Sequence, residues 1–137
     1  MSLILDSSAT LAWAFPDEKT AAIKAVFHMI AEDGAIVPEL WRIEVANVLN
    51  AGIRRRRIVL KNRTDILAEL MVLPISIDSE TMLHTWEETL ALADAYQLTL
   101  YDATYLELAL RLGLPLATLD EALRDAAERE GVLLLGR

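Results

Sequence analysis

Short apolar segments alternate with longer amphipathic segments along this chain, and this alternation constrains the fold more than any other feature. The apolar segments are typical of buried strands and the amphipathic segments of helices. Alternating strands and helices favour a parallel sheet with helices on both faces. The sequence therefore predicts a three-layer α/β/α fold with a central, mostly parallel sheet. Strands are expected at Leu3–Leu5, Ala35–Pro38, Ile75–Ile77, Leu114–Leu119 and Val132–Leu135.

The segments between these strands carry helix signals. Gly34 and Gly113 are expected to end helices. The segment Glu39–Arg56 has apolar residues around most of its circumference, so we expect that helix to be largely buried. The expected helices run over Ser8–Ala14, Asp17–Glu32, Glu39–Arg56, Asn62 or Thr64 to Leu70, Asp78 or Ser79 to Tyr96, Tyr101–Leu112 and Asp120–Glu130.

Composition indicates one globular domain and excludes several classes of protein. The chain has 137 residues, of which 54% are hydrophobic, so it can bury a sizeable core and is not disordered. It has no Cys, which excludes disulfides, thiolate metal sites and Cys nucleophiles. No apolar run reaches the roughly 18 residues of a membrane span, and the N-terminus lacks a signal-peptide pattern. We expect a single domain over residues 1–137, located in the cytoplasm.

The charges are unevenly distributed. The formal net charge of −8 does not indicate a nucleic-acid partner, whose phosphates bind Lys and Arg. Residues 40–63, however, hold seven of the thirteen basic residues and one acid, Glu44. These basic residues are Arg42, Arg54, Arg55, Arg56, Arg57, Lys61 and Arg63. An acidic protein thus carries one concentrated basic patch.

Four acidic residues lie at strand ends or in helices where a charged side chain is expected to have a specific partner. Asp6 follows the first expected strand and Asp120 follows the fourth. Parallel strands end at the same edge of a sheet, and ligands bind in the crevice beyond that edge. Glu44 lies inside an apolar helix, and Asp102 lies in the first turn of another. Taken singly, the three aspartates can act as helix caps, and Glu44 can pair with an arginine.

Taken together, the four carboxylates favour a cation site. Carboxylates packed close to one another repel, so they require protons or metal ions. Oxygen ligands without His or Cys suit Mg²⁺ or Mn²⁺ and argue against zinc. Two such ions about 4 Å apart activate a water and stabilise the leaving oxygen of a phosphodiester. Asp6 is the expected central ligand of such a site.

The sequence around these acids resembles the PIN-domain ribonucleases. The resemblance rests on Asp6 after the first strand and on the segments Glu44–Leu49, Tyr101–Ala109 and Thr118–Leu123. The length and the order are similar to the VapC toxins of type II toxin–antitoxin pairs, and the resemblance covers essentially the whole chain. No single motif is specific, whereas four acids in this order at this spacing are.

The resemblance implies a PIN-like fold and a Mg²⁺- or Mn²⁺-dependent endoribonuclease whose acids surround a shallow groove. Thr118 matches the Ser or Thr that assists at the last strand, and Ser7 matches the hydroxyl residue after the first acid. The family commonly forms homodimers, and a cognate antitoxin blocks the enzyme with a tail that enters the groove. By position, the family's acidic quartet corresponds to Asp6, Glu44, Asp102 and Asp120.

The expected reaction is in-line hydrolysis of an RNA phosphodiester, with the toxin inhibiting translation or growth. Asp6 and Asp120 would bind or bridge the metal, and Asp102 would complete the shell directly or through water. Glu44 would ligate a metal or orient the attacking water. The run Arg54–Arg57 would contact RNA or the antitoxin, unless it is a solvated helix end whose cations favour the helix dipole.

Two other phosphoryl-transfer classes fit less well. A receiver domain requires a Lys after a late strand, and neither Lys19, Lys24 nor Lys61 stands there. A phosphatase of the haloacid dehalogenase type requires a second Asp two residues after the first, where this chain has Ser8. The non-enzymatic alternative is a module whose acids hold structural Mg²⁺ and which binds RNA or protein without cleavage. It predicts metal-dependent stability without turnover.

Overall fold

A five-stranded sheet lies at the centre of the computed structural model, which describes residues 1–137. Its strand order is β3-β2-β1-β4-β5, and all four pairings are parallel. The strands are β1 (Leu3–Leu5), β2 (Ala35–Val37), β3 (Ile75–Ile77), β4 (Leu116–Ala117) and β5 (Leu134–Leu135). This confirms the parallel α/β fold expected from the alternation, although β4 and β5 are shorter than expected.

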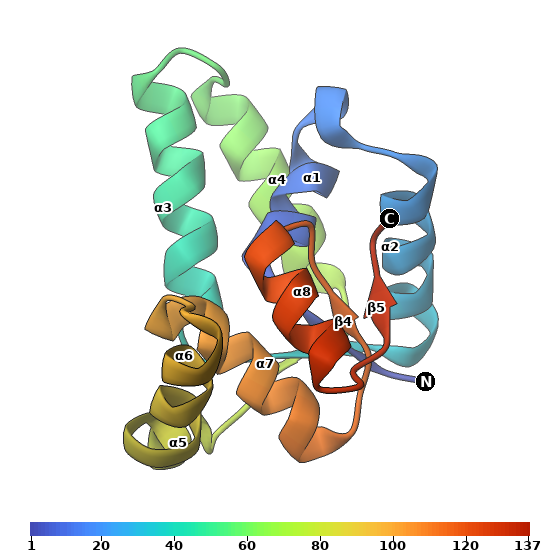
Figure 1. Cartoon of the computed structure of the whole chain (residues 1–137). Helices are drawn as coiled ribbons and strands as arrows, with labels where there is room; N and C mark the ends of the chain where they lie inside the picture. The colour runs from blue at the N-terminus through green and yellow to red at the C-terminus, as the bar shows by residue number, and fades with distance from the viewer.

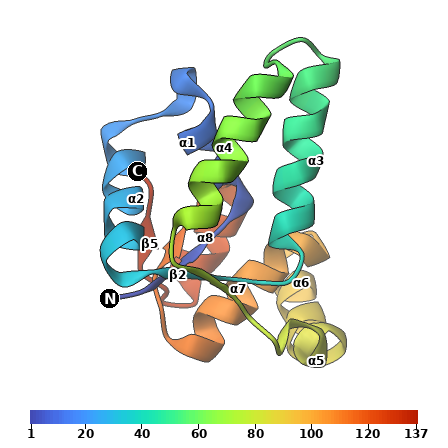
Figure 2. The same ribbon diagram turned by 180° about the vertical axis from the view of Figure 1, so that it is seen from behind.

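Helices cover both faces of the sheet and give the three layers. Helix α8 lies in front of the sheet in Figure 1, and α4 lies on the opposite side, as the reversed view in Figure 2 shows. The helical elements are α1 (Ser7–Ala14), η1 (Pro16–Glu18), α2 (Ala21–Asp33), α3 (Trp41–Arg54), α4 (Leu60–Val72), α5 (Thr81–His84), η2 (Thr85–Thr89), α6 (Leu90–Tyr96), α7 (Leu100–Leu112) and α8 (Glu121–Arg129).

The central strand β1 is buried along its whole length because helices cover both of its faces. Leu3, Ile4 and Leu5 have no exposed surface, which explains why their side chains are uniformly apolar rather than alternating. β1 pairs with β2 on one side and with β4 on the other. The carboxyl ends of β1 and β4 therefore lie next to each other, which brings the residues after both strands to one edge of the sheet.

Asp17 and Asp78 do not begin the helices expected to start with them, and each residue has another partner. Helix α2 is capped by Thr20, whose side chain accepts a hydrogen bond from the Ile23 amide, and not by Asp17. Asp17 lies in η1 and forms a salt bridge with Arg57. Asp78 does not begin α5 because its carboxylate accepts hydrogen bonds from Arg111 instead.

Helix α4 also starts earlier than expected, at Leu60. Neither Asn62 nor Thr64 is its N-cap residue, which is Val59. The Asn62 side chain instead accepts a 3.0 Å hydrogen bond from the Val59 amide, so it stabilises the first turn from inside the helix. Gly34 ends α2 with a positive φ of 83°, and Gly113 ends α7 with a φ of 65°, as expected from glycine's access to this region.

Helix α3 is less buried than its apolar pattern predicts. Trp41, Val45 and Leu49 are buried on one face, whereas Ile43 on the other face is 74% exposed. The segment Thr81–Tyr96 is also not one regular helix, because η2 in its middle is a π-helix. No helix is long and apolar enough to cross a membrane.

Candidate active site

The Asp6 side chain does not cap the helix that follows it. Asp6 occupies the N-cap position of α1, but its carboxylate makes no capping hydrogen bond. Its Oδ2 atom instead accepts two 2.6 Å hydrogen bonds, from the Ser8 and Thr118 hydroxyls. The residue is 2% exposed, and burial raises the pKa of its carboxyl against the lowering effect of these hydroxyls. Asp6 is therefore a buried carboxylate held by side chains rather than a helix cap.

The hydroxyls that hold Asp6 also organise the segment after β4. Thr118 Oγ1 accepts a 3.1 Å hydrogen bond from the Asp120 amide, and Ser8 Oγ accepts a 2.9 Å hydrogen bond from the Leu119 amide. The two hydroxyl oxygens lie 3.2 Å apart. This network fixes the ends of β1 and β4 relative to each other, and it places Asp120 beside Asp6.

Asp120 is the N-cap residue of α8, which confirms the capping role expected for it as one of two alternatives. Its Oδ1 atom accepts a 2.9 Å hydrogen bond from the Leu123 amide. The negative charge of Asp120 raises the pKa values of both Asp6 and Asp102. Asp120 is thus a cap and at the same time a member of the acidic cluster, so the two roles do not compete.

Asp102 enters the cluster from the first turn of α7. The helix is capped by Thr99, whose hydroxyl accepts a 3.1 Å hydrogen bond from the Asp102 amide, so the Asp102 side chain is not needed for capping. Burial, followed by the charges of Asp120 and Asp6, raises the pKa of Asp102 to about 6. Glu44 adds a smaller effect in the same direction. The four acids therefore act on one another electrostatically.

Glu44 reaches the cluster from the first turn of α3, and it pairs with a tyrosine rather than an arginine. The Tyr105 hydroxyl donates a 2.5 Å hydrogen bond to Glu44 Oε1. Burial raises the pKa of Glu44, the Tyr105 hydroxyl lowers it, and the charge of Asp6 raises it. Ser7, the other expected supporting residue, donates a long 3.4 Å hydrogen bond to Asp6 Oδ1.

None of the four acids forms a salt bridge with a lysine or arginine. Every ion pair in the structure involves other carboxylates, and the most buried of these pairs join Arg111 to Asp78 and Glu107. The four side chains offer only oxygen atoms, and burial and neighbouring charges raise the pKa values of Asp6, Glu44 and Asp102. This matches the donor chemistry of a hard divalent cation. No group of three or more of these side chains is spaced as a formed metal site. The acids thus have the ligand chemistry of a divalent-cation site, although their side chains are not spaced as a formed site.

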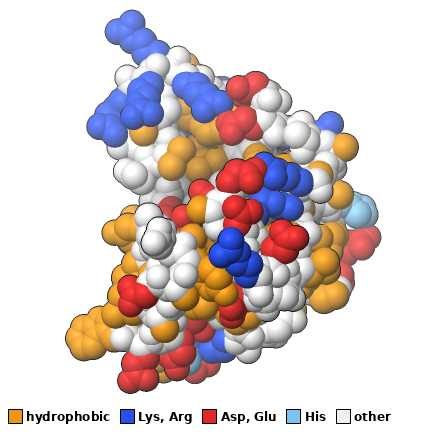
Figure 3. Space-filling view, viewed as in Figure 1, with side chains coloured by type: hydrophobic (Ala, Val, Ile, Leu, Met, Phe, Trp, Pro, Cys, Tyr) orange, Lys and Arg blue, Asp and Glu red, His pale blue; other side chains and the backbone are white.

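Of the four arginines expected to contact RNA or the antitoxin, one is paired within the protein and three are not. Arg57 is engaged by the protein itself: its guanidinium lies 2.8 Å from Glu18 and 4.0 Å above the Phe15 ring. Arg54, Arg55 and Arg56 are exposed and form no salt bridge. Figure 3 shows basic side chains gathered at the end of the molecule formed by α3 and α4. Only this exposed group is available to a partner.

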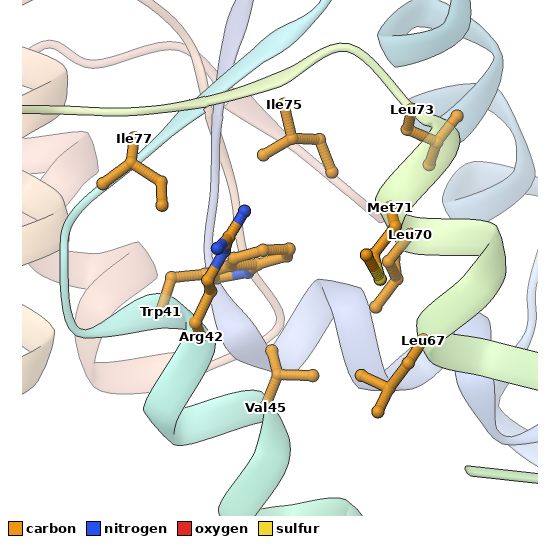
Figure 4. A pocket seen from close by; sticks show the side chains of 9 residues that line it. All are labelled: Trp41, Arg42, Val45, Leu67, Leu70, Met71, Leu73, Ile75 and Ile77. Atoms are coloured by element: carbon orange, nitrogen blue, oxygen red, sulfur yellow. The ribbon is translucent and has the colours of Figure 1, made fainter. Parts of the chain in front are cut away.

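A separate apolar pocket of about 250 Å³ lies between α3, α4 and β3. Figure 4 shows the side chains around it, with Arg42 as the one charged group. Its lining residues are Trp41, Arg42, Val45, Leu67, Leu70, Met71, Leu73, Ile75 and Ile77. None of the four acids lines this pocket, so it is not where their chemistry would occur.

Two residues of the acidic cluster were not singled out by the sequence. In the sequence, Ser8 has the signal of a helix start, and Tyr105 is one residue of the segment Tyr101–Ala109. Ser8 and Asp6 are two positions apart, which is a weak signal because helix starts are rich in serine. Tyr105 lies three residues after Asp102 on α7, and this helical spacing was the available signal that both face the same site.

The sequence profile of the PIN domain matches residues 3–129, which is nearly the whole chain. The chain belongs to the PIN-domain family. The match spans β1 to α8 and so includes all four acids and the two hydroxyl residues that hold Asp6.

A curated sequence and a solved structure from Pyrobaculum aerophilum are similar to this chain. The chain is 29% identical over 125 residues to Ribonuclease VapC3 of that organism, which covers 91% of this chain and 94% of the relative. The crystal structure of PAE2754 from the same organism superposes with a TM-score of 0.71 at 24% identity, covering 98% of this chain and 83% of that one. This second similarity concerns the fold alone.

Proposed function

We propose that this protein is a divalent-metal-dependent endoribonuclease of the VapC type. The observation that carries the proposal is the cluster of Asp6, Glu44, Asp102 and Asp120, which has no basic partner. Burial and the charges of neighbouring acids raise the pKa values of Asp6, Glu44 and Asp102. The similarity to Ribonuclease VapC3 supports RNA as the substrate. The PIN-domain match across the chain supports one nuclease domain over residues 1–137.

The proposed chemistry is hydrolysis of an RNA phosphodiester. Mg²⁺ or Mn²⁺, when bound, supplies a Lewis acid that activates water and neutralises charge on the phosphate. The four carboxylates would hold the cation. Ser8 and Thr118 engage Asp6 Oδ2, which leaves Oδ1 with only the long contact from Ser7. These hydroxyls thus restrict the orientation of Asp6, and a restricted ligand loses less freedom when a cation binds.

The biological role that we propose is that of a toxin which inhibits translation or growth and is restrained by a cognate antitoxin in the cytoplasm. Arg54, Arg55 and Arg56 support this role because they are exposed cations on an otherwise acidic protein. They can contact either the phosphates of RNA or acidic groups of the antitoxin. Arg57 contributes less, since Asp17 and Glu18 already neutralise it.

A homodimer is the second part of the proposal. The segment formed by α5 and η2 exposes Met82, Leu83 and Trp86, and Trp86 is 87% exposed. Exposed apolar patches of this kind are typical of protein–protein contacts. Light scattering tests this part: wild-type protein should have the mass of two chains and Trp86→Ser the mass of one.

The experiment that tests the enzymatic proposal is cleavage of an RNA panel by wild type and Asp6→Asn, with Mg²⁺ or Mn²⁺ and with EDTA. Wild type should cleave only with metal. Asp6→Asn should lose at least about a hundred-fold, because even residues that merely orient a ligand typically contribute ten- to a hundred-fold. Asp94→Asn, the same change at an exposed position on α6, should retain full activity. Unchanged metal-dependent cleavage by Asp6→Asn would sink the assignment.

The same protein samples distinguish the nuclease from the non-catalytic alternative when thermal stability is measured beside cleavage. A module that holds structural Mg²⁺ should gain thermal stability on metal addition and cleave no RNA. The nuclease should gain stability and also turn over. Loss of the stability gain in Asp6→Asn together with inactive wild type would therefore favour the binding module.

A further inference from the structure

Tyr105 connects α7 to α3 inside the acidic cluster. Its side chain is fully buried, and its hydroxyl donates a 2.5 Å hydrogen bond to Glu44 Oε1. The two residues are 61 positions apart in the sequence. Tyr105 lies one helical turn after Asp102, so one face of α7 presents both an acid and the donor that holds a second acid.

The Glu44 carboxylate depends on Tyr105 for its orientation. No lysine or arginine forms a salt bridge with Glu44, and the Ser7 hydroxyl is a weaker neighbour of both side chains. A glutamate on the first turn of a helix has several rotamers available, and an unpaired carboxylate beside Asp6 would be pushed away by its charge. The hydrogen bond opposes this repulsion and selects one arrangement.

The phenol is suited to this task because it remains a donor. A tyrosine hydroxyl carries a hydrogen that it can donate, whereas a phenylalanine ring of the same shape has none. A protonated phenol has one hydrogen to donate, and Glu44 Oε1 receives it. The second oxygen of Glu44, Oε2, takes no part in this bond.

We propose that Tyr105 is a positioning residue that orients Glu44 toward the cation and the RNA of the proposed nuclease, on whose function this inference rests. It acts through Glu44 and does not itself touch substrate. A purely structural role is the competing explanation, since a buried tyrosine ring stabilises any core. The two explanations separate when the hydroxyl is removed and the ring is kept.

The test compares wild type, Tyr105→Phe, Glu44→Ala and the double variant. Mn²⁺ affinity is measured by isothermal titration calorimetry, and kcat and KM are measured with a fixed RNA. Tyr105→Phe should lower Mn²⁺ affinity or kcat about ten- to a hundred-fold, as expected for a residue that orients a ligand, while KM for RNA stays within about twofold. In the Glu44→Ala background, which has no side-chain acceptor for the Tyr105 hydroxyl, the same change should have no further effect.

Tyr96→Phe is the matched control. Tyr96 also donates its hydroxyl hydrogen to a glutamate, Glu130, but at the protein surface and away from the four acids. This variant should match wild type in Mn²⁺ affinity and kcat. Circular dichroism and thermal unfolding of all variants verify that the measured proteins are folded.

The inference is overturned if Tyr105→Phe remains within about threefold of wild type in both Mn²⁺ affinity and kcat. It is also overturned if Tyr105→Phe causes an equal loss with and without Glu44, since Tyr105 would then act independently. Failure of the proposed nuclease function gives a different set of results. If wild type binds Mn²⁺ but cleaves no RNA, the nuclease proposal fails and Mn²⁺ affinity alone decides the role of Tyr105. If wild type neither binds nor cleaves, both proposals fail.

Discussion

The Thr118 hydroxyl at the end of β4 donates a 2.6 Å hydrogen bond to Asp6 Oδ2 at the end of β1, although the two residues are 112 positions apart. The bond exists because β1 and β4 are neighbours in the sheet. It holds a buried carboxylate that no lysine or arginine neutralises. A buried charge without a counter-charge is costly to folding, and this cost leads to the first prediction.

Asp6→Asn should raise the thermal unfolding midpoint of the metal-free protein. Burial raises the pKa of Asp6, which means that the ionised carboxylate destabilises the fold near neutral pH. The amide removes that charge and keeps the volume of the side chain. Differential scanning calorimetry in EDTA at pH 7.5 measures the change, with Asp94→Asn as the exposed control. A lower midpoint for Asp6→Asn would contradict this prediction.

The metal-free protein should become less stable as pH rises from about 4 to about 7. The pKa of Asp102 is about 6 in the folded protein against a reference value of 3.8, so the folded state binds more protons over this interval. The free energy of unfolding therefore decreases through it. The shift corresponds to at most about 3 kcal/mol, and screening of this partly exposed carboxylate reduces the effect to about 1 kcal/mol.

Urea unfolding in EDTA at several pH values measures this slope. Asp102→Asn should flatten it, because the amide does not titrate in this range. Asp125→Asn, which replaces an exposed carboxylate on α8, should leave the slope unchanged. An unfolding free energy that increases with pH in wild type would show that the acids do not repel one another as described.

Arg111→Met should destabilise the protein by about 3–5 kcal/mol, the usual cost of leaving buried charges without a partner. Arg111 binds Asp78 through both terminal nitrogens and Glu107 through Nε, and the carboxylates are only 8% and 6% exposed. Arg57→Met is the control, since its pairs at the surface contribute about 0–1 kcal/mol. Chemical unfolding measures both variants, and equal losses would contradict the prediction.

Replacing Arg54 and Arg55 with alanine should weaken RNA binding and make it less sensitive to salt. Each phosphate contact on a single strand contributes about 0.7 to the slope of log affinity against log salt, so the slope should fall by about 1.4. Fluorescence anisotropy with inactive Asp6→Asn as the host avoids cleavage during the measurement. Lys24→Ala, an exposed cation on α2, is the control. An unaltered slope would remove these arginines from the RNA-binding surface.

The layers and strand segments were predictable because they depend on local pattern. Leu3–Leu5 is uniformly apolar, since both faces of β1 are covered, and this run is visible in the sequence. The end of a helix at Gly34 was predictable for the same reason, because its positive φ favours glycine. Parallel pairing of the strands alone is enough to predict that Asp6 and Asp120 lie at one edge of the sheet.

The partners of polar side chains were not predictable, because they come from distant segments. Asp78 looks like a helix cap until Arg111, 33 residues later, is placed against it. Likewise, the burial of α3 was overestimated, because its apolar outer face, including Ile43, is not covered by another element. Tyr105 and Ser8 gained their roles only when their contacts with Glu44 and Asp6 were known.

The separation between Asp6 and Thr118 has a consequence for synthesis. Asp6 is synthesised 112 residues before Thr118, and Asp120 follows two residues after Thr118. β1 has no β4 partner until that segment has emerged, so Asp6 lacks both the strand and the hydroxyl that hold it. The cluster of acids that we propose as a metal site is therefore incomplete until the segment after β4 has been synthesised.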